Sequence, residues 1–314
     1  MARRRKNKKA KSFSAIIIII ALLVTSWQII PKLFNKYDEA LSPAEGNGVL
    51  VGEFLDVDQA DCQLFRMPDG KTALIDAGDR GDGEEIVDYL KDNNISKIDY
   101  LIATHPHADH IGGMSDVVDS FEIGKIFLPK IAEDDIPTSK TYEEFLESIA
   151  KKNITPTIAK AGDLLFEGED YKALCFSPSS TDYDDLNHYS LTVKITYGIH
   201  SFLLTGDAET VNEKEMLKGD YPLKSDVLKV GHHGSESSTS KKFLKAVNPK
   251  YAIISCGEDN DYGHPHKETL DILNKQSGLE KIYRTDLDKT IIVTADGKTE
   301  DGIKITKQNP TVVE

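Results

Sequence analysis

Three histidines and an aspartate fall within the six residues from His105 to His110, in the stretch "ATHPHADHIGG". His105 and His107 are two positions apart, so in an extended or tightly turned loop both imidazoles can face one cation. Asp109 and His110 follow at the expected start of a helix, where they can face a second cation. Imidazole nitrogens and carboxylate oxygens suit divalent transition metals. The spacing therefore predicts a loop that holds a pair of metal ions.

Further reactive-looking polar residues recur where apolar runs end. Asp76 follows "ALI", and Asp207 follows "FLLTG". The two carboxylate oxygens of Asp207 make it the best candidate for a bridge between two cations. His232 and His233 follow "VLKVG", and one of them would complete the second site. If the runs are neighbouring strands, their ends meet at one edge and place these groups in a common cleft.

Short strand-like runs recur along the chain from Val49, and helical patterns lie between them. The expected strands are "LVGEFLDV", "CQLFRM", "TALIDAG", "IDYLIATH", "KIFLP", "SLTVKITYG", "HSFLLTGD", "DVLKVGHH", "YAIISCG" and "KTIIVTA", and the expected helices are "GEEIVDYLKDNN", "SKTYEEFLESIAKKN", "KKFLKAV" and "KETLDILNKQSG". The early strands follow one another directly, whereas the later ones alternate with helices. This order predicts two sheets with helices outside them. Gly198 lies between two expected strands and predicts a tight hairpin.

An uncharged apolar segment over residues 13–30, "FSAIIIIIALLVTSWQII", follows a strongly basic start. As a helix rising ~1.5 Å per residue it is just long enough to span the ~30 Å hydrocarbon layer if flanking residues help. We expect a membrane anchor there, with a basic cytoplasmic tail over residues 1–12 and the rest of the chain outside the cell. The alternative is a cleaved signal peptide, since Val24 and Ser26 are small enough for a poor cleavage site. We favour the anchor because the isoleucine-rich run is longer than a usual signal-peptide core.

A linker is expected over residues 31–48, which mix charge, proline and glycine without periodicity. No second linker and no internal repeat follows, so we expect one domain over residues 49–306 and a short tail over residues 307–314. Three widely spaced cysteines predict neither a disulfide framework nor a cysteine metal site, and each is expected to be part of the core. They are Cys62, Cys175 and Cys256.

The charge balance of the chain is acidic, with 38 basic and 52 acidic residues and a formal net charge of −14. Seven of the basic residues lie in the first eleven positions, so the rest of the chain is more acidic still. Such a surface repels a phosphate backbone at long range. A nucleic-acid substrate would therefore need metal ions or a local basic patch to hold it.

The stretch "THPHADHIGG" resembles the first metal motif of the metallo-β-lactamase superfamily. Other stretches resemble the hydrolase domain found at the C-terminal end of the ComEC/Rec2 DNA-uptake proteins and in stand-alone relatives: "FLDVDQADCQLF", "LIDAG", "NHYSLTVKITYGIHSFLLTGDAE", "SDVLKVGHHGSESSTSKKFL", "YAIISCGEDNDYGHPH" and "IYRTD". The likeness extends over residues 49–306. It implies an α/β fold, the four-layer αβ/βα sandwich, with the metals at one edge of two sheets.

The resemblance also implies two divalent metal ions and a set of ligands. These are His105, His107, Asp109, His110, Asp207 and one of His232 and His233. The donors suit Zn²⁺, Mn²⁺ or Fe alike, so the sequence does not select the metal. Zn²⁺ and Mn²⁺ are the ions we expect.

Two departures from the family pattern affect the expected site. Asp58 and Ala60 stand where family members usually have glycine, so we expect a differently shaped turn. Many superfamily enzymes have a ligand histidine before the "TGD" strand, where this subfamily tends to have asparagine. Asn187 and His188 lie in that region, so one metal site is expected to have fewer protein ligands. We assign Asn187 to substrate binding.

The expected chemistry is hydrolysis by a metal-activated water without a protein nucleophile. Asp109 would bind metal and also orient the water. His264 in "YGHPH" would hold a phosphate oxygen or protonate the leaving group, although a loop hydrogen bond is an equally good explanation. Ser235, which follows "HHG", would donate a hydrogen bond to phosphate, with a polar loop or a helix cap as the alternative.

The leading hypothesis is an outward-facing, membrane-anchored metal-dependent hydrolase, namely a phosphodiesterase or nuclease of the ComEC/Rec2 type with DNA as one candidate substrate. The main alternative is a surface phosphoesterase acting on a wall or membrane phosphoester such as phosphorylcholine, which the acidic body slightly favours. A non-catalytic binding protein with a vestigial metal site is the alternative of another class, and the intact ligand set argues against it. The sequence indicates no protein partner.

The expected anchor and topology can be tested by adding protease to intact cells. The protease should digest the domain and spare a tag fused at Met1, because the positive charge keeps the tail in the cytoplasm. A protected domain would reverse the topology. A domain found free in the medium would instead favour the cleaved signal peptide.

Overall fold

The structure is a computed structural model that describes residues 48–308. The expected basic tail and membrane anchor, and nearly all of the expected linker, lie outside the described residues. Within residues 48–308, no helix is both long enough and apolar enough to cross a bilayer.

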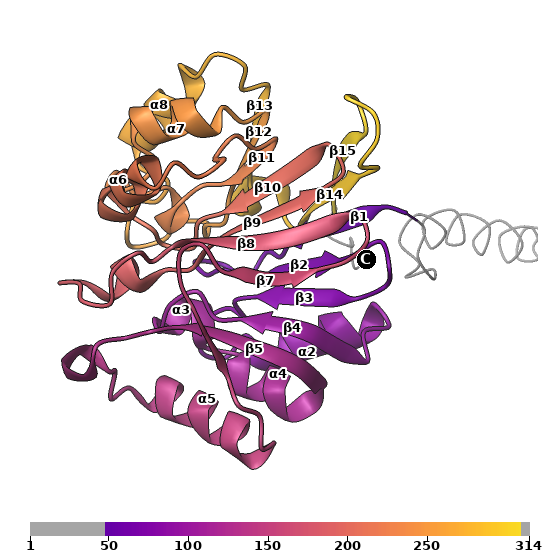
Figure 1. Cartoon of the computed structure of the whole chain (residues 1–314), viewed down its shortest axis with the longest axis vertical. Helices are drawn as coiled ribbons and strands as arrows, with labels where there is room; N and C mark the ends of the chain where they lie inside the picture. Colours follow the sequence, from indigo (N-terminus) through magenta and orange to yellow (C-terminus); the bar gives the residue numbers. More distant parts are fainter. Residues whose placement is uncertain (1–47, 309–314) are drawn as a thin grey trace, which may run out of the picture. The chain divides into compact units, whose positions relative to one another are not determined.

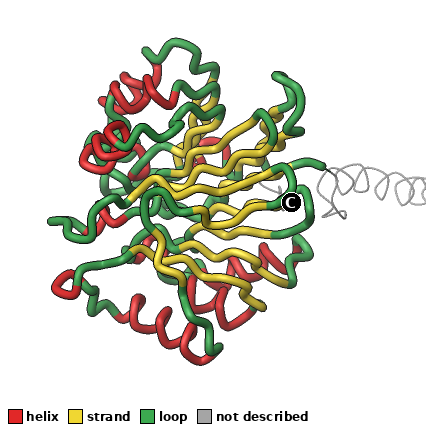
Figure 2. Tube along the Cα trace, viewed as in Figure 1, coloured by secondary structure: helices red, strands yellow, loops and turns green. Residues whose placement is uncertain are grey.

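Two β-sheets lie face to face with helices on their outer sides (Figure 1), and Figure 2 shows the same layers by type of element. The first sheet has the order β15 (Ile303–Lys307), β14 (Ile291–Ala295), β1 (Leu50–Phe54), β2 (Gln63–Arg66), β3 (Thr72–Ile75), β4 (Lys97–Ile102), β5 (Glu122–Pro129) and β6 (Thr157–Ala159). The second has the order β13 (Lys281–Arg284), β12 (Tyr251–Ile254), β11 (Val227–Lys229), β10 (His200–Leu204), β9 (Thr192–Tyr197), β8 (Tyr171–Ser177) and β7 (Leu164–Glu167). Phe65 of β2 and Phe202 of β10 meet edge to face with ring centroids 5.5 Å apart, so the sheets share one buried interior.

The helices form the two outer layers, each over its own apolar cluster. The first sheet is covered by α2 (Gly83–Asp92), α3 (Ala108–Ile111), α4 (Met114–Ser120) and α5 (Lys140–Lys151), and the second by α6 (Thr210–Lys218), α7 (Lys241–Val247) and α8 (Lys267–Asn274). A short helix, α9 (Thr285–Asp288), follows β13. The αβ/βα sandwich expected from the sequence is confirmed.

Helix α5 shows how the local sequence produces an outer layer. Ser139 begins the helix by accepting a hydrogen bond from the backbone N–H of Tyr142 at 3.3 Å. Phe145 and Ile149 are four positions apart, so both face the sheet, and both are buried. Burying each side chain contributes about 1.5–3 kcal/mol. The helix is therefore held mainly by packing against the sheet.

Parallel strands bring their carboxyl ends to one edge of the sandwich. β3 and β4 are parallel in the first sheet, and β10, β11 and β12 are parallel in the second. The loops after these strands carry the polar residues noted in the sequence. Helix α3 lies at this edge (Figure 1). Strand β1 runs in the same direction as β3, because both are antiparallel to β2, so β1 begins at the opposite end of the sheets.

Several elements were not expected from the sequence. Strands β6, β7, β8, β13 and β15 and helix α6 did not appear among the predicted runs. Helix α6 has little apolar periodicity, because two of its three buried residues are Asn212 and Glu213. It starts instead with a reciprocal capping arrangement between Glu209 and Asn212. By contrast, the hairpin at Gly198 and the buried free cysteines are confirmed.

The glycine pair after the histidine-rich loop allows close backbone contact. A Cβ on Gly112 would lie 2.0 Å from the carbonyl carbon of Asp79 and 2.4 Å from the nitrogen of Arg80. A Cβ on Gly113 would lie 2.6 Å from the carbonyl oxygen of Ala77. The backbone N–H groups of both glycines donate to carbonyls of this facing segment at 2.9 Å. These contacts hold α3 and its polar residues against the loop after β3.

We predict that Gly112→Ala lowers the free energy of unfolding by about 1–3 kcal/mol, because backbone must shift to admit the methyl group. Asp119→Ala, an exposed position on the neighbouring helix α4, should change it by about 0.5 kcal/mol or less. Denaturant unfolding of the two variants would measure both values. Equal stability of Gly112→Ala and the wild type would contradict the close contact.

Candidate metal centre

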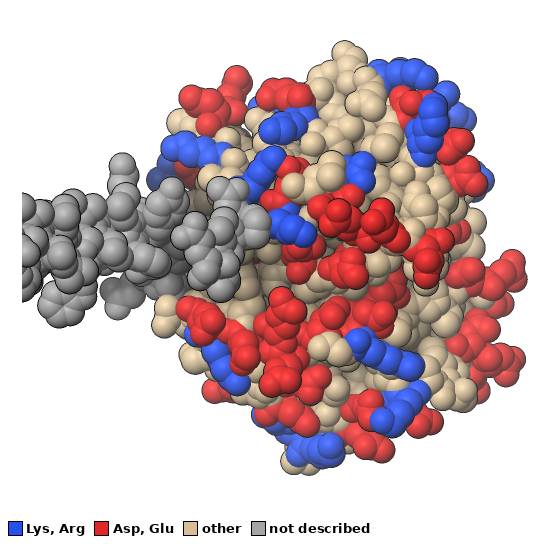
Figure 3. Space-filling view, turned by 180° about the vertical axis from the view of Figure 1, so that it is seen from behind, with Lys and Arg blue, Asp and Glu red and all other residues tan. Residues whose placement is uncertain are grey.

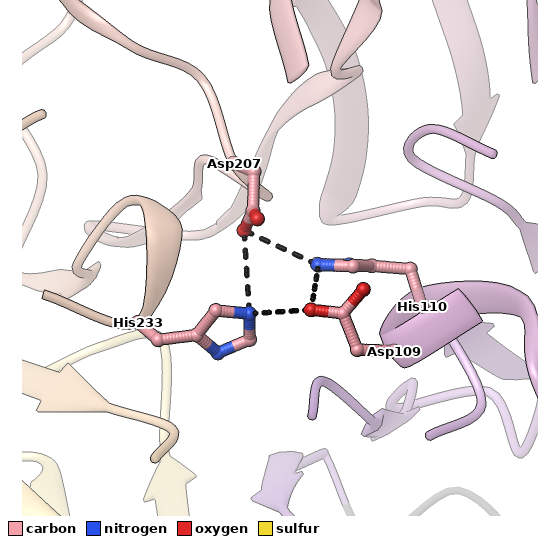
Figure 4. A group of neighbouring side chains, drawn as sticks. All are labelled: Asp109, His110, Asp207 and His233. Atoms are coloured by element: carbon pink, nitrogen blue, oxygen red, sulfur yellow. Dashed lines mark ion pairs between the residues drawn. The ribbon is translucent and has the colours of Figure 1, made fainter. Parts of the chain in front are cut away.

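Four side chains from both sheets converge at the edge formed by the strand ends (Figure 4). Asp109 and His110 come from α3, Asp207 follows β10, and His233 follows β11. One donor atom from each of the four lies within 4.8 Å of the others. His110 Nε2 is 3.2 Å from Asp207 Oδ1, and His233 Nε2 is 3.3 Å from Asp109 Oδ2. The four donors therefore surround a common point.

The donor atoms of this group fit a cation better than they fit one another. His110 Nε2, His233 Nε2 and Asp207 Oδ1 are all buried, and none of them has a hydrogen-bond partner. Leaving a buried polar group unsatisfied costs about 1–3 kcal/mol, so native proteins rarely do it without a reason. A bound divalent cation would satisfy all three atoms together, and two imidazole nitrogens with two carboxylate oxygens are donors that zinc and manganese accept.

A second group of donors meets the other oxygen of Asp207. His105 Nε2 and His232 Nε2 lie 3.9 Å and 3.7 Å from Asp207 Oδ2. His105 Nε2 is also 3.0 Å from His107 Nδ1. Asp207 thus presents one oxygen to each group of imidazoles, which is the arrangement that a bridging ligand requires. Its role as a bridge remains a prediction.

In three of the candidate ligand histidines, the Nδ1 atom, which lies on the side of the ring away from Asp207, forms a hydrogen bond to a neighbouring oxygen. His110 Nδ1 donates to Asp76 Oδ2 at 2.7 Å, and His233 Nδ1 donates to the Ser255 carbonyl at 3.0 Å. His232 Nδ1 donates to Glu209 Oε1 at 3.1 Å. A donated Nδ1–H leaves the lone pair on Nε2, which in each case is the atom near Asp207. These hydrogen bonds therefore orient the rings for ligation.

A buried ion pair lies behind the candidate ligands and joins the two sheets. Lys229 Nζ of β11 is 2.6 Å from Asp61 Oδ2, and both side chains are 1% exposed. Asp61 precedes β2, and its Oδ1 is 3.7 Å from His233 Nδ1. Because removing one partner would leave the other charge buried and unpaired, we expect either single replacement to cost about 3–5 kcal/mol.

Electrostatics within the site favour ionised carboxylates. Burial alone would raise the pKa of Asp207, but His110, His233 and His105 hold that pKa well below its usual range. Burial alone would lower the pKa of His110, whereas Asp207, Asp76 and Asp109 together raise it well above its usual value. In the absence of a cation, a proton on His110 balances the carboxylates. Metal binding would replace that proton.

Beyond the donors lies a cavity of about 330 Å³. It is lined by Gln59, His107, Ala108, Asp109, Asn187, Asp207, His232, His233, Tyr262 and His264. Burial, and then the neighbouring His233 and His232, lower the pKa of His264 to about 4, so this ring is neutral near neutral pH. Tyr262 is 68% exposed and stacks on His264 with ring centroids 5.6 Å apart. The cavity is large enough to admit a substrate beside the donor groups.

The remaining predicted site residues differ in their placement. Asn187 lines the cavity, and its buried Oδ1 has no hydrogen-bond partner. Ser235 is not among the lining residues, and its Oγ lies 2.9 Å from Ser237 Oγ within the loop after β11. His188 donates to Glu209 Oε2 at 3.1 Å and is thereby turned toward this carboxylate. Asp58 has a left-handed backbone with φ of 55°, the conformation that glycine adopts most readily.

Five residues near the site were missing from the predicted ligand and substrate-binding sets. They are Gln59, Asp61, Asp76, Glu209 and Lys229. Asp76 had a recognisable signal, since it stands at a strand end like Asp207. Lys229 had another, because a lysine inside the apolar run "DVLKVG" needs a buried partner. Nothing in the sequence singled out Glu209. In the structure, hydrogen bonds from His232, Ser237 and His188 lower its pKa to about 2.

Comparison of the sequence with known proteins identifies a family and several relatives. The sequence profile of the metallo-beta-lactamase superfamily matches residues 55–258. ComE operon protein 3 of Bacillus subtilis is 34% identical over 210 residues, which are 67% of this chain and 26% of that protein. Recombination protein 2 of Haemophilus influenzae is 34% identical over 227 residues, which are 70% of this chain and 26% of that protein. The matched region is thus about a quarter of each relative's length.

The fold likeness extends to solved structures. The metallo-beta-lactamase fold protein YhfI from Bacillus subtilis superposes with a TM-score of 0.50 at 13% sequence identity. The superposition covers 75% of this chain and 95% of YhfI. At this level of identity the likeness concerns the fold alone.

We predict that Asp207→Ala lowers metal affinity more than His107→Ala does, because Asp207 faces both groups of donors. The loss should exceed the ~10–100-fold that residues outside the ligand shell contribute. Elemental analysis of the purified full chain would measure metal content. His200→Ala is the control, since His200 lies in β10 beside Asp226 and Asp296 and should leave the metal content unchanged. Full metal occupancy in the Asp207 variant would remove Asp207 from the ligands.

Proposed function

The chain belongs to the metallo-beta-lactamase superfamily and is related to competence proteins, and we propose that it is a metal-dependent phosphodiesterase with DNA as the leading candidate substrate. The observation that carries this proposal is the placement of Asp207, with one oxygen toward each group of imidazoles at the floor of the cavity. Two divalent cations, when bound, would supply Lewis acidity and an activated water. Zn²⁺ and Mn²⁺ are the candidate ions.

The residues that line the cavity favour attack by water. None of the ten lining residues is a serine, threonine or cysteine, so the cavity offers neither an aliphatic hydroxyl nor a thiol as a nucleophile. Asp109 has an ionised carboxylate at the cavity surface, where it can bind metal and accept a hydrogen bond from the attacking water. Asn187 and His264 offer polar contacts for a phosphate oxygen.

The cellular setting is part of the same proposal. The uncharged segment over residues 13–30 and the basic residues before it support a single membrane anchor with the catalytic domain outside the cell. A phosphodiester substrate would then be met at the outer surface. This setting is compatible with DNA or with a component of the wall or membrane.

A second candidate substrate is a phosphoester with a cationic head group such as phosphorylcholine. Figure 3 shows acidic side chains gathered across the middle of one face of the molecule. In the loop after β12, the exposed Glu258, Asp259 and Asp261 lie close in sequence to the exposed Tyr262 of the cavity. An aromatic ring with nearby carboxylates suits a quaternary ammonium group and disfavours a polyanion.

The substrate assay uses the purified full chain, depleted of metal and then supplied with Zn²⁺ or Mn²⁺. Candidate substrates are single-stranded DNA, duplex DNA, bis(p-nitrophenyl) phosphate and p-nitrophenyl phosphorylcholine. Metal-dependent cleavage of DNA would support the leading proposal. Cleavage of the phosphorylcholine ester without cleavage of DNA would favour the second candidate. Metal binding without any hydrolysis would favour the non-catalytic binding protein.

We predict that His264→Ala keeps its metal but loses roughly 10²–10⁴-fold in turnover, the usual scale for a positioned acid–base group. His266→Ala is the matched control, because His266 contacts the backbone of Glu236 and Tyr262 and does not line the cavity. Loss of metal in proportion to activity would make His264 a ligand. Unchanged turnover would mean that His264 only forms hydrogen bonds that hold its loop.

A further inference from the structure

Gln59 connects the loop after β1 to the loop after β12 through the two ends of its side-chain amide. The backbone N–H of Gly257 lies 3.0 Å from Gln59 Oε1, and Gln59 Nε2 lies 3.2 Å from His264 Nδ1. A backbone N–H can only donate, so the amide atom that it meets must be the carbonyl oxygen. The orientation of the Gln59 amide is therefore fixed, with its NH₂ group toward His264.

This orientation determines where His264 carries its proton. The NH₂ group of Gln59 can only donate, so Nδ1 of His264 must accept. A neutral imidazole whose Nδ1 accepts a hydrogen bond carries its proton on Nε2. None of the residues described in the structure forms a hydrogen bond with His264 Nε2, and the ring lines the cavity 5.5 Å from the His232 ring.

We propose that Gln59 is a positioning residue that holds His264 in its Nε2–H tautomer, so that His264 donates a hydrogen bond to an anionic oxygen of the substrate and is not a metal ligand. The inference rests on the proposed function only for the identity of that oxygen, which would belong to a phosphoryl group. An imidazole nitrogen that carries a proton has no lone pair for a cation. In this tautomer, His264 therefore contacts the substrate and does not bind a metal ion.

Neighbouring contacts hold both partners of this hydrogen bond in place. Asn260 Oδ1 accepts from the backbone N–H of His264 at 2.9 Å, and Asn260 Nδ2 donates to the His264 carbonyl at 2.6 Å. A Cβ on Gly257 would lie 2.0 Å from Asp58 Oδ1, so the two loops are in close contact. The left-handed backbone of Asp58 immediately precedes Gln59. The "DVDQAD" turn thus places the amide where it reaches both Gly257 and His264 of the loop after β12.

The tautomer can be read directly by long-range ¹H–¹⁵N correlation spectra of the full chain labelled with ¹⁵N-histidine, recorded with and without Zn²⁺. We expect the Nε2–H pattern for His264 in both states. His266 provides an internal control, because its Nδ1 accepts from the backbone N–H of Glu236 at 3.0 Å and its Nε2 donates to the Tyr262 carbonyl at 3.1 Å. His266 should show the same tautomer in every variant.

Gln59→Glu is the decisive variant because it keeps the shape of the side chain and replaces the donor with an acceptor. One carboxylate oxygen can still accept from Gly257, and the other would now accept from His264 Nδ1. The proton of His264 should move to Nδ1, or the ring should become doubly protonated. Turnover should fall by about 10–100-fold, while metal content stays at the wild-type level. Gln308→Glu, an exposed position, is the matched control for the added charge and should change neither.

Three results would overturn the inference: an Nδ1–H pattern for His264 in the wild type, a Zn²⁺-dependent change that marks His264 as a ligand, or an unchanged His264 pattern in a folded Gln59→Glu variant. The wild-type spectra decide the tautomer even if that variant does not fold. They also need no substrate. A wild-type protein that shows the expected tautomer but cleaves no phosphodiester would overturn the proposed function and, with it, the assignment of the phosphoryl oxygen, while the role of Gln59 toward His264 would stand.

Discussion

The buried donors around Asp207 are the feature on which the site depends. His110 Nε2, His233 Nε2 and Asp207 Oδ1 are buried close together without a hydrogen-bond partner, and a protein rarely keeps such a cluster without a compensating charge. Cations would compensate the carboxylates and use the lone pairs of the imidazoles at once. The outer contacts, from Asp76 to His110 and from Glu209 to His232, are then explained as supports that keep each ring turned toward the cation.

The same edge also joins the two halves of the sandwich. Asp109 and His110 belong to the layers of the first sheet, whereas Asp207 and His233 follow strands of the second. The Lys229–Asp61 pair crosses between the sheets directly behind them. Metal binding and the packing of the sheets would therefore be coupled, because any displacement of one sheet relative to the other would separate the candidate ligands. Metal binding would therefore also require that the apolar interior between the sheets holds them rigidly in place.

The sequence predicted the parts of this protein that are encoded locally. The loop from His105 to His110 could be recognised because its candidate ligands are adjacent in the chain, and α5 and the Gly198 hairpin follow from short-range patterns. Glu209 and Gln59 could not be assigned in the same way, because their roles depend on partners brought close by the fold, such as Gly257, which is 198 positions from Gln59. Helix α6 was missed because it buries polar side chains in place of a clear apolar stripe. Ser235 lies near the ligands in sequence, yet its hydroxyl is engaged by Ser237 within its own loop.

The position of Gly48 bears on how such a domain can be reused. Strand β1 begins at the end of the sheets opposite to α3, so the first described residues lie at a surface remote from the candidate metal centre. The candidate ligands, the residues that line the cavity and the inter-sheet ion pair all lie within residues 59–264. In a domain built in this way, a different sequence could be joined at the N-terminal side without changing the residues of the candidate metal centre. In the two relatives compared above, the matched region makes up 26% of a longer protein.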